Sequence, residues 1–268
     1  MKIYLHTIAL EPARWTAQRV SQNLIDLLPV IAEAGFPEVE VFEPHLTSET
    51  TSGDIRDAFA RNGVAPVILS SYLNMNPAVT SDAQVDALAD QIAERIAFYG
   101  FQKVRLFPGA GMKPGDAEGI RILRERIQRV AARIPGTDIL LETHDGSVAD
   151  DPQVLVQLVR YLGNPRVGLL FQPTYFKDVD LIREQFQLEK PYIRHIHLQN
   201  RNPDASFAGM EEGIVPWPEI LREIAEGVES TLEFVPVGIC GVEGFDLAKT
   251  VDQVKSEAAY VRRLCPGG

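Results

Sequence analysis

The stretch DILLETH (residues 138–144) is a short apolar run that ends in polar residues, and three later runs repeat its design. Those runs are VGLLFQP (167–173), IRHIHLQN (193–200) and STLEFVP (230–236). Each run carries a metal-binding type of side chain at or near its C-terminal end, in chain order Glu142, Gln172, His197 and Glu233. Carboxylate, amide and imidazole groups supply the oxygen and nitrogen atoms that bind Mn²⁺, Co²⁺ or Mg²⁺. The spacing of the runs therefore suggests one metal centre.

Short runs typical of strands alternate with longer amphipathic stretches along the whole chain. Eight strands are predicted, over residues 2–10, 38–44, 65–72, 102–108, 137–142, 167–172, 192–199 and 230–237. Eight β/α units in 268 residues give about 33 residues per unit, which is typical of a closed (β/α)8 TIM barrel. An open doubly wound sheet is the alternative, but residues 7–15 lack the glycine-rich turn that it favours. No linker marks a second domain, so residues 1–268 are predicted to form one domain.

The stretches between the predicted strands have the end signals of helices. Ser81, Asp116 and Asp151 are residue types that favour the start of a helix, and Gly100 favours the end of the one that begins at Ser81. The last helix is predicted over residues 247–264. In a barrel of this kind the reactive residues lie at the C-terminal ends of the strands. The four candidate ligands occupy such ends on predicted strands five to eight.

Side chains of one parity along a strand face the same side of a sheet. On strand five Glu142 and His144 share a face, and on strand seven His195, His197 and Gln199 do. The alternative is that both histidines bind neighbouring backbone groups and have no metal. This alternative does not explain Glu142 and Glu233, which lie inside apolar strands, where an unpaired carboxylate is costly. A bound cation removes that cost, which favours the metal site.

The formal charge of −11 and the pI near 5.0 oppose nucleic acid binding, because a protein that follows phosphates needs a basic face. Only Cys240 and Cys265 are present, which favours free thiols over a disulfide framework or a zinc pair. Residues 1–10 lack a signal-peptide pattern, and no run approaches the ~18 apolar residues that span a bilayer. We therefore expect a soluble, cytoplasmic protein with no nucleic acid and no membrane among its partners.

Five stretches together resemble the xylose isomerase-like barrel superfamily, of the sugar-phosphate isomerase/epimerase type. They are AGFPEVEVFEP (34–44), LLETHDGSVADDP (140–152), VGLLFQP (167–173), HIHLQNRN (195–202) and GIVPWPEIL (213–221). The resemblance implies a metal shell of Glu, Asp, His and Glu, which by position corresponds to Glu142, Gln172, His197 and Glu233. Gln172 departs from the usual aspartate. A neutral amide removes one negative charge, so the ion is held more weakly and acts as a stronger Lewis acid, or the metal has been lost.

The same resemblance implies residues that contact the substrate around the metal. His144 corresponds to the histidine of a Glu-x-His motif, and Arg201 to an arginine that meets substrate hydroxyl groups. Tyr175 lies where a substrate-binding histidine is often found, and His195 shares the face of His197.

Other residues are open to two interpretations at this stage. His6 and Glu43 are near the ends of strands one and two, where a surface or capping role competes with substrate contact. Arg105 belongs either to the barrel interior or to an ion pair that faces a helix. Trp217 is expected to anchor the core, and the glycine-rich residues 238–244 to form a plain loop.

A metal with two open positions can chelate a hydroxy-ketone and acidify its neighbouring C–H bond. The resemblance implies that Glu142 and Glu233 then move the proton, as catalytic residues and ligands at once. We therefore expect a divalent-metal-dependent isomerase or epimerase of a small sugar, with Mn²⁺ as the first candidate and Co²⁺ or Mg²⁺ as the others. A lyase or dehydratase that acts on a keto-sugar or inosose, and a metal-free sugar-binding subunit, are the alternatives. Homo-oligomerisation stays open.

Overall fold

The computed structural model of the chain describes residues 1–46, 51–176, 178–224 and 226–265. Eight parallel strands form a closed barrel, which confirms the predicted (β/α)8 TIM barrel fold. The barrel strands are β1 (Ile3–His6), β2 (Glu38–Phe42), β3 (Ala65–Ser70), β4 (Lys103–Leu106), β5 (Asp138–Glu142), β6 (Val167–Phe171), β7 (Ile193–Leu198) and β10 (Glu229–Leu232).

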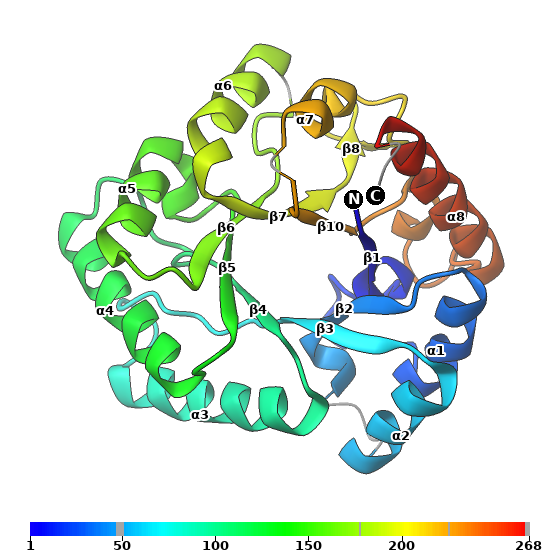
Figure 1. Cartoon of the computed structure of the whole chain (residues 1–268), viewed down its shortest axis with the longest axis horizontal. Helices are drawn as coiled ribbons and strands as arrows, with labels where there is room; N and C mark the ends of the chain where they lie inside the picture. Colours follow the sequence, from blue (N-terminus) through cyan, green and yellow to red (C-terminus); the bar gives the residue numbers. More distant parts are fainter. Residues whose placement is uncertain (47–50, 177, 225, 266–268) are drawn as a thin grey trace. The chain divides into compact units, whose positions relative to one another are not determined.

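Eight α-helices occupy the described residues, and Figure 1 shows them in the colours of the chain. They are α1 (Leu24–Glu33), α2 (Ser52–Asn62), α3 (Asp82–Tyr99), α4 (Ala117–Arg133), α5 (Pro152–Leu162), α6 (Val179–Glu189), α7 (Trp217–Glu223) and α8 (Leu247–Leu264). Among the described residues every helix is too short or too polar to span a membrane.

The predicted helix ends are confirmed because the expected capping groups are in place. Ser81 begins α3 in a capping box with Gln84, and Gly100 ends it in the left-handed conformation, with φ +82°. Asp116 accepts a hydrogen bond from the backbone of α4. Asp151 does the same for α5, whose first residue is a proline with no N–H to satisfy.

The chain divides into two compact units, which are described separately. The first unit holds Met1–Val67, Tyr175–Arg183 and Ile196–Gly268, with β1, β2 and β10. The second holds Ile68–Thr174 and Glu184–His195, with β4, β5 and β6. In the second unit these three strands lie side by side in chain order, with α3, α4 and α5 outside them (Figure 1). That residues 1–268 form one domain stays a prediction.

Strand register in the first unit brings polar residues to the same level. Leu5 of β1 pairs with Leu232 of β10, and one residue further along come His6 and Glu233. On the other side of β1, His6 pairs with Glu40 of β2. Because paired residues of parallel strands point to the same face, these three side chains share one side of the sheet.

All eight barrel strands are shorter than predicted, and three of them run into 3-10 helices. The chain turns into 3-10 helices at Thr7–Leu10, Glu43–Leu46 and Pro236–Ile239, where extended structure was predicted. At the first, the His6 ring accepts the Ile8 N–H and so caps the turn. A small hairpin of β8 (Asn200–Arg201) and β9 (Phe207–Ala208), which the sequence did not predict, follows β7.

Trp217 is fully buried at the start of α7, as predicted for a core anchor. Its indole Nε1–H donates to the carbonyl of Gln199 at 3.0 Å, so the ring also fixes the chain just beyond β7. A buried indole requires such a partner, because an unsatisfied donor in the core is costly.

A second anchor is the buried carboxylate of Glu11, which gathers the loop that follows β1. It accepts hydrogen bonds from the backbone N–H groups of Ala13, Ser21 and Gln22, and its Oε2 lies 3.1 Å from His45 Nε2. Burial by itself raises the pKa of Glu11, but the hydrogen bonds from His45 and the loop outweigh burial and lower it to about 2.

We predict that this carboxylate makes the fold sensitive to acid. Because its folded pKa lies below its ordinary value of 4.5, its contribution is present above pH ~4.5 and is lost as the pH falls towards 2. Glu11→Gln places an amide N–H₂ against several donors, so we expect it to cost about 2 kcal/mol at pH 7 and less near pH 2. Urea denaturation across that range measures the difference.

The matched control is Glu33→Gln, which changes an exposed carboxylate on α1. Equal stabilities of the Glu11 variant and wild type at pH 7 would show that the loop does not depend on this carboxylate.

Candidate functional site

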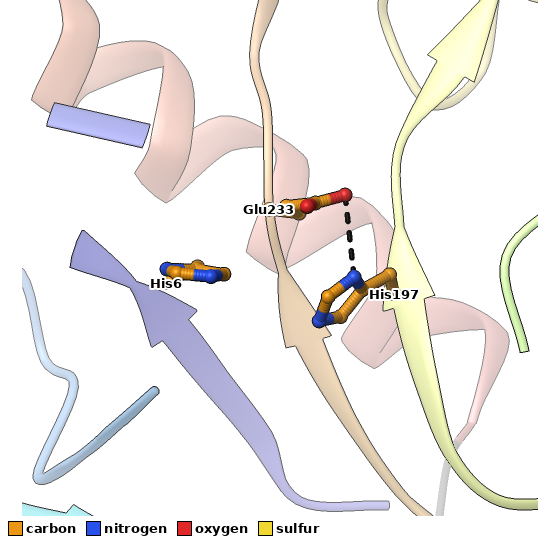
Figure 2. A group of neighbouring side chains, drawn as sticks. All are labelled: His6, His197 and Glu233. Carbon is orange, nitrogen blue, oxygen red and sulfur yellow. Dashed lines mark ion pairs between the residues drawn. The ribbon is translucent and has the colours of Figure 1, made fainter. Parts of the chain in front are cut away.

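Three buried side chains of the first unit form a group whose atoms could hold one metal ion. They are His6, His197 and Glu233, and one ligand atom of each lies within 4.8 Å of the other two. Figure 2 shows them converging from β1, β7 and the end of β10. The two imidazole rings lie 5.8 Å apart between centroids, with a tilt of 58°. The group therefore combines two nitrogen donors and one carboxylate at the C-terminal ends of barrel strands.

The His197 ring lies against two carboxylates at once. Its Nδ1 is 3.3 Å from Glu233 Oε2, the contact drawn as a dashed line in Figure 2. Its Nε2 is 3.0 Å from Glu40 Oε2. The backbone N–H of Glu233 donates to the carbonyl of Leu198 at 3.1 Å, which fixes the start of the next segment beside β7. The predicted ligands His197 and Glu233 are therefore brought together.

Glu233 is also held by a chain of polar groups that contacts the same carboxylate oxygen as His197. The amide Nε2 of Gln199 donates to Glu233 Oε2 at 2.8 Å, and the same amide accepts from Arg201 Nε at 3.2 Å. The Arg201 guanidinium contacts two aromatic rings, 4.7 Å from the centroid of Phe176 and 4.1 Å from that of Phe207. Arg201 therefore orients Gln199, which in turn orients Glu233.

The sequence interpretation of His6 was right in one respect and wrong in another. Its ring caps the 3-10 turn after β1, as the capping interpretation expected, but it is fully buried and not at the surface. It also belongs to the candidate metal group, a role that the sequence did not indicate.

Glu40 was not singled out from the sequence, although a signal was present. It is an acidic residue among the apolar residues of β2 (EVEVF). Glu142 and Glu233 were singled out for the same reason, because each is an acidic residue next to apolar residues of a strand. In the structure it is fully buried and faces both His6 and His197.

In the second unit Glu142 pairs with a cation from the neighbouring strand. Its Oε2 lies 2.9 Å from Arg105 Nε, and each side chain is only 2% exposed. The guanidinium also lies 4.2 Å from the Phe107 ring centroid and 5.1 Å from that of Tyr72. Arg105 is thus a buried residue of an ion pair with a strand carboxylate. The metal role of Glu142 stays a prediction.

Backbone contacts hold Gln172 in position. Its N–H and carbonyl both bond to the Thr143 hydroxyl, at 2.5 and 2.6 Å, and Gln185 Nε2 donates to the same carbonyl at 3.1 Å. The residue is nearly buried and follows the last residue of β6, as expected for a strand-end position. Coordination of a metal by its side-chain amide stays a prediction.

The four predicted substrate contacts differ in accessibility. The His144 side chain is 43% exposed and packs edge-on against Phe107 at 4.9 Å. Tyr175 and Arg201 are half-buried in the first unit. His195 is fully buried, two residues before His197. Their roles towards a substrate stay predictions, and Glu43 lies in a 3-10 turn after β2.

The fold and the buried polar group define a (β/α)8 barrel protein with a candidate metal centre at the C-terminal ends of its strands. A family profile for xylose isomerase-like TIM barrels matches residues 28–263, and the chain belongs to that family. A search of curated protein sequences found no match.

Solved structures of the same fold share little sequence with the chain. A probable 3-DHS dehydratase, AsbF from Bacillus anthracis, is 19% identical with a TM-score of 0.74, and the alignment covers 100% of both chains. D-psicose 3-epimerase, solved in the presence of D-fructose, is 16% identical with a TM-score of 0.73 and the same full coverage. The zinc-bound IOLI protein is 16% identical with a TM-score of 0.72, over 98% of this chain and 99% of that one.

The buried pair of Arg105 and Glu142 gives a test of how the second unit is stabilised. Removal of one partner leaves an unpaired buried charge, so we expect Arg105→Met or Glu142→Leu alone to cost about 3 to 5 kcal/mol in the metal-free protein. The double variant should lose much less than the sum, because an apolar pair needs no compensation. Urea unfolding of the four proteins measures this cycle. Additive losses would mean that the two charges do not compensate each other.

Proposed function

We propose that the protein is a divalent-metal-dependent isomerase or epimerase of a small sugar or keto-sugar. The observation that carries the proposal is the buried group of His6, His197 and Glu233, whose ligand atoms lie within 4.8 Å of one another. Membership of the xylose isomerase-like family supports an enzyme of this type. The proposed substrate is a small sugar molecule. The proposed location is the cytoplasm, with no nucleic acid as a partner.

The residues present fit a divalent ion. Two ligands bound to one ion at about 2.1 Å, and at angles of about 90° to 110°, lie about 3.0 to 3.5 Å apart. His197 Nδ1 and Glu233 Oε2 lie 3.3 Å apart, within that interval. Family resemblance adds Glu142 and Gln172 to the proposed ligands. Zinc is bound in the IOLI protein and magnesium in a xylose isomerase-like TIM barrel protein from Mycobacterium smegmatis, and for this chain we propose Mn²⁺ first.

When bound, the ion would supply charge that acidifies the C–H bond beside a substrate carbonyl. Glu233 would act on that proton, and the donor Gln199 keeps its carboxylate from rotating away. Glu142 would act from the opposite face of the sugar, and its ion pair with Arg105 would hold the carboxylate in place. Return of the proton to the other face gives epimerisation, and return to the neighbouring carbon gives isomerisation. Arg201, His144, Tyr175 and His195 are the proposed contacts to substrate hydroxyl groups.

A lyase or dehydratase is the second candidate, and the exposure of His144 favours it. A leaving hydroxyl group needs a proton donor that can reach it, and the His144 ring is 43% exposed. A structural neighbour is described as a probable 3-DHS dehydratase. A metal-free sugar-binding subunit is the third candidate, and elemental analysis of the purified protein separates it from the other two.

We predict that metal binding depends on His197 and Glu233, whose contact is drawn in Figure 2. The double change His197→Gln and Glu233→Gln removes one nitrogen and one anionic ligand, so we expect at least a 100-fold weaker affinity for Mn²⁺. Gln172→Asp should tighten binding, because it adds a negative charge to the proposed shell. Competition with a chelator measures both changes, and Glu33→Gln on exposed α1 is the control. Wild-type affinity in the double variant would place the ion elsewhere.

We also predict that Glu233→Gln loses about 10²- to 10⁴-fold in turnover, because the amide cannot accept the substrate proton. A panel of keto-sugars incubated in heavy water identifies the substrate and the reaction. Wild-type enzyme should place solvent deuterium on the carbon beside the carbonyl, and loss of water from the product would indicate the dehydratase. Circular dichroism establishes that the variant is folded. Full turnover by Glu233→Gln, with no deuterium uptake by wild type, contradicts proton abstraction.

A further inference from the structure

The carboxylate of Glu40 lies between the two histidines of the candidate metal group. Its Oε2 is 3.0 Å from His197 Nε2, and its Oε1 is 3.4 Å from His6 Nε2. The side chains of all three residues are fully buried. A buried carboxylate needs positive or hydrogen-bonding partners, and each of its two oxygens faces one imidazole nitrogen.

The backbone determines which nitrogen of His6 carries the proton. The N–H of Ile8 donates to His6 Nδ1 at 3.2 Å, so Nδ1 presents a lone pair. In a neutral ring the proton is then on Nε2, the nitrogen that faces Glu40. A metal ion bound at His6 Nε2 would have to displace that proton while Nδ1 still accepts from the backbone. His6 is therefore better suited to support the group than to bind the ion.

His197 has the opposite role, because it is suited to bind the ion. Glu40 accepts a hydrogen bond from Nε2, because an ionised carboxylate has no proton to donate. Nδ1 faces a second carboxylate, Glu233 Oε2, at 3.3 Å, and it is the nitrogen left to bind an ion that enters between these two atoms. His197 thus presents a donor atom and Glu233 presents another on the same side.

We propose that Glu40 is a positioning residue that keeps the proton of both rings on Nε2, so that His197 binds the metal through Nδ1 and His6 does not bind it. This inference rests on the proposed metal-dependent function. A histidine ligand commonly donates its second N–H to a carboxylate, and loss of that partner typically weakens metal binding 10- to 100-fold.

Only a carboxylate can fill this position. The amide of a glutamine has one acceptor oxygen, so it could accept from one ring while its N–H₂ group faces the Nε2–H of the other. Glu40→Gln keeps the size of the side chain and creates this conflict. Glu38→Gln is the matched control on the same strand, because Glu38 pairs with Lys2 at the other end of β2.

The first experiment measures Zn²⁺ affinity by chelator competition. We expect Glu40→Gln to bind 10- to 100-fold more weakly than wild type, and Glu38→Gln to bind like wild type. Glu40→Asp retains two acceptor oxygens on a shorter side chain, so its affinity should lie between those of wild type and Glu40→Gln. If Glu40→Gln binds Zn²⁺ like wild type, the inference is wrong while the metal site stands.

The second experiment locates the ring protons by nitrogen NMR with ¹⁵N-labelled histidine. The chain has five histidines, and His6→Asn and His197→Asn assign the two signals. We expect Nε2–H on His6 in metal-free wild type and on His197 in the Zn²⁺-bound protein. A proton on Nδ1 of His6 in the metal-free protein, or on Nδ1 of His197 in the Zn²⁺-bound protein, overturns the inference, even if Glu40→Gln fails to fold. If wild type binds no Zn²⁺, the proposed function fails. The His6 signal still tests whether Glu40 keeps the proton of that ring on Nε2.

Discussion

The cost of burying a carboxylate determines how the interior of this protein is organised. Glu11, Glu40 and Glu142 are almost completely inaccessible to solvent, and each has a basic side chain beside it. His45 accompanies Glu11, two histidines accompany Glu40, and Arg105 accompanies Glu142. The type of basic partner differs between these carboxylates, and this difference affects what each site can bind. An arginine stays charged beside its carboxylate and offers only donors, whereas an imidazole ring can donate to a carboxylate and still present a lone pair to a ligand.

Parallel strand pairing provides these partners at no additional conformational cost. In a parallel ladder, paired residues face the same way, so polar side chains at equal heights meet without any special loop. His6 and Glu40 are such a pair in β1 and β2. Arg105 of β4 pairs with Leu140 of β5, and the Glu142 side chain lies two residues further along the same face. The closed barrel thus places reactive groups together by register alone.

The fold could be predicted from sequence because its signals are local. Strand alternation and the caps at Ser81, Gly100 and Asp151 depend only on neighbouring residues. The partners of the site residues could not be predicted in the same way. The contacts of Glu40 depend on which strands are adjacent and at what register, and a single acidic residue in an apolar run does not contain that information. The departure of Gln172 from the aspartate that the family resemblance implies was visible in the sequence, but its effect depends on whether an ion binds beside it.

The amide of Gln199 faces a carboxylate with its N–H₂ group and a guanidinium with its oxygen. Its two neighbours have opposite charges, so the position requires a neutral group that donates at one end and accepts at the other. A glutamate there would repel Glu233, and a lysine would repel Arg201. Asparagine has the right chemistry but is one methylene shorter. Gln199 therefore ties the hairpin that contains Arg201 to the segment after β10 that contains Glu233, so a change of charge at either neighbour would require a different side chain at position 199.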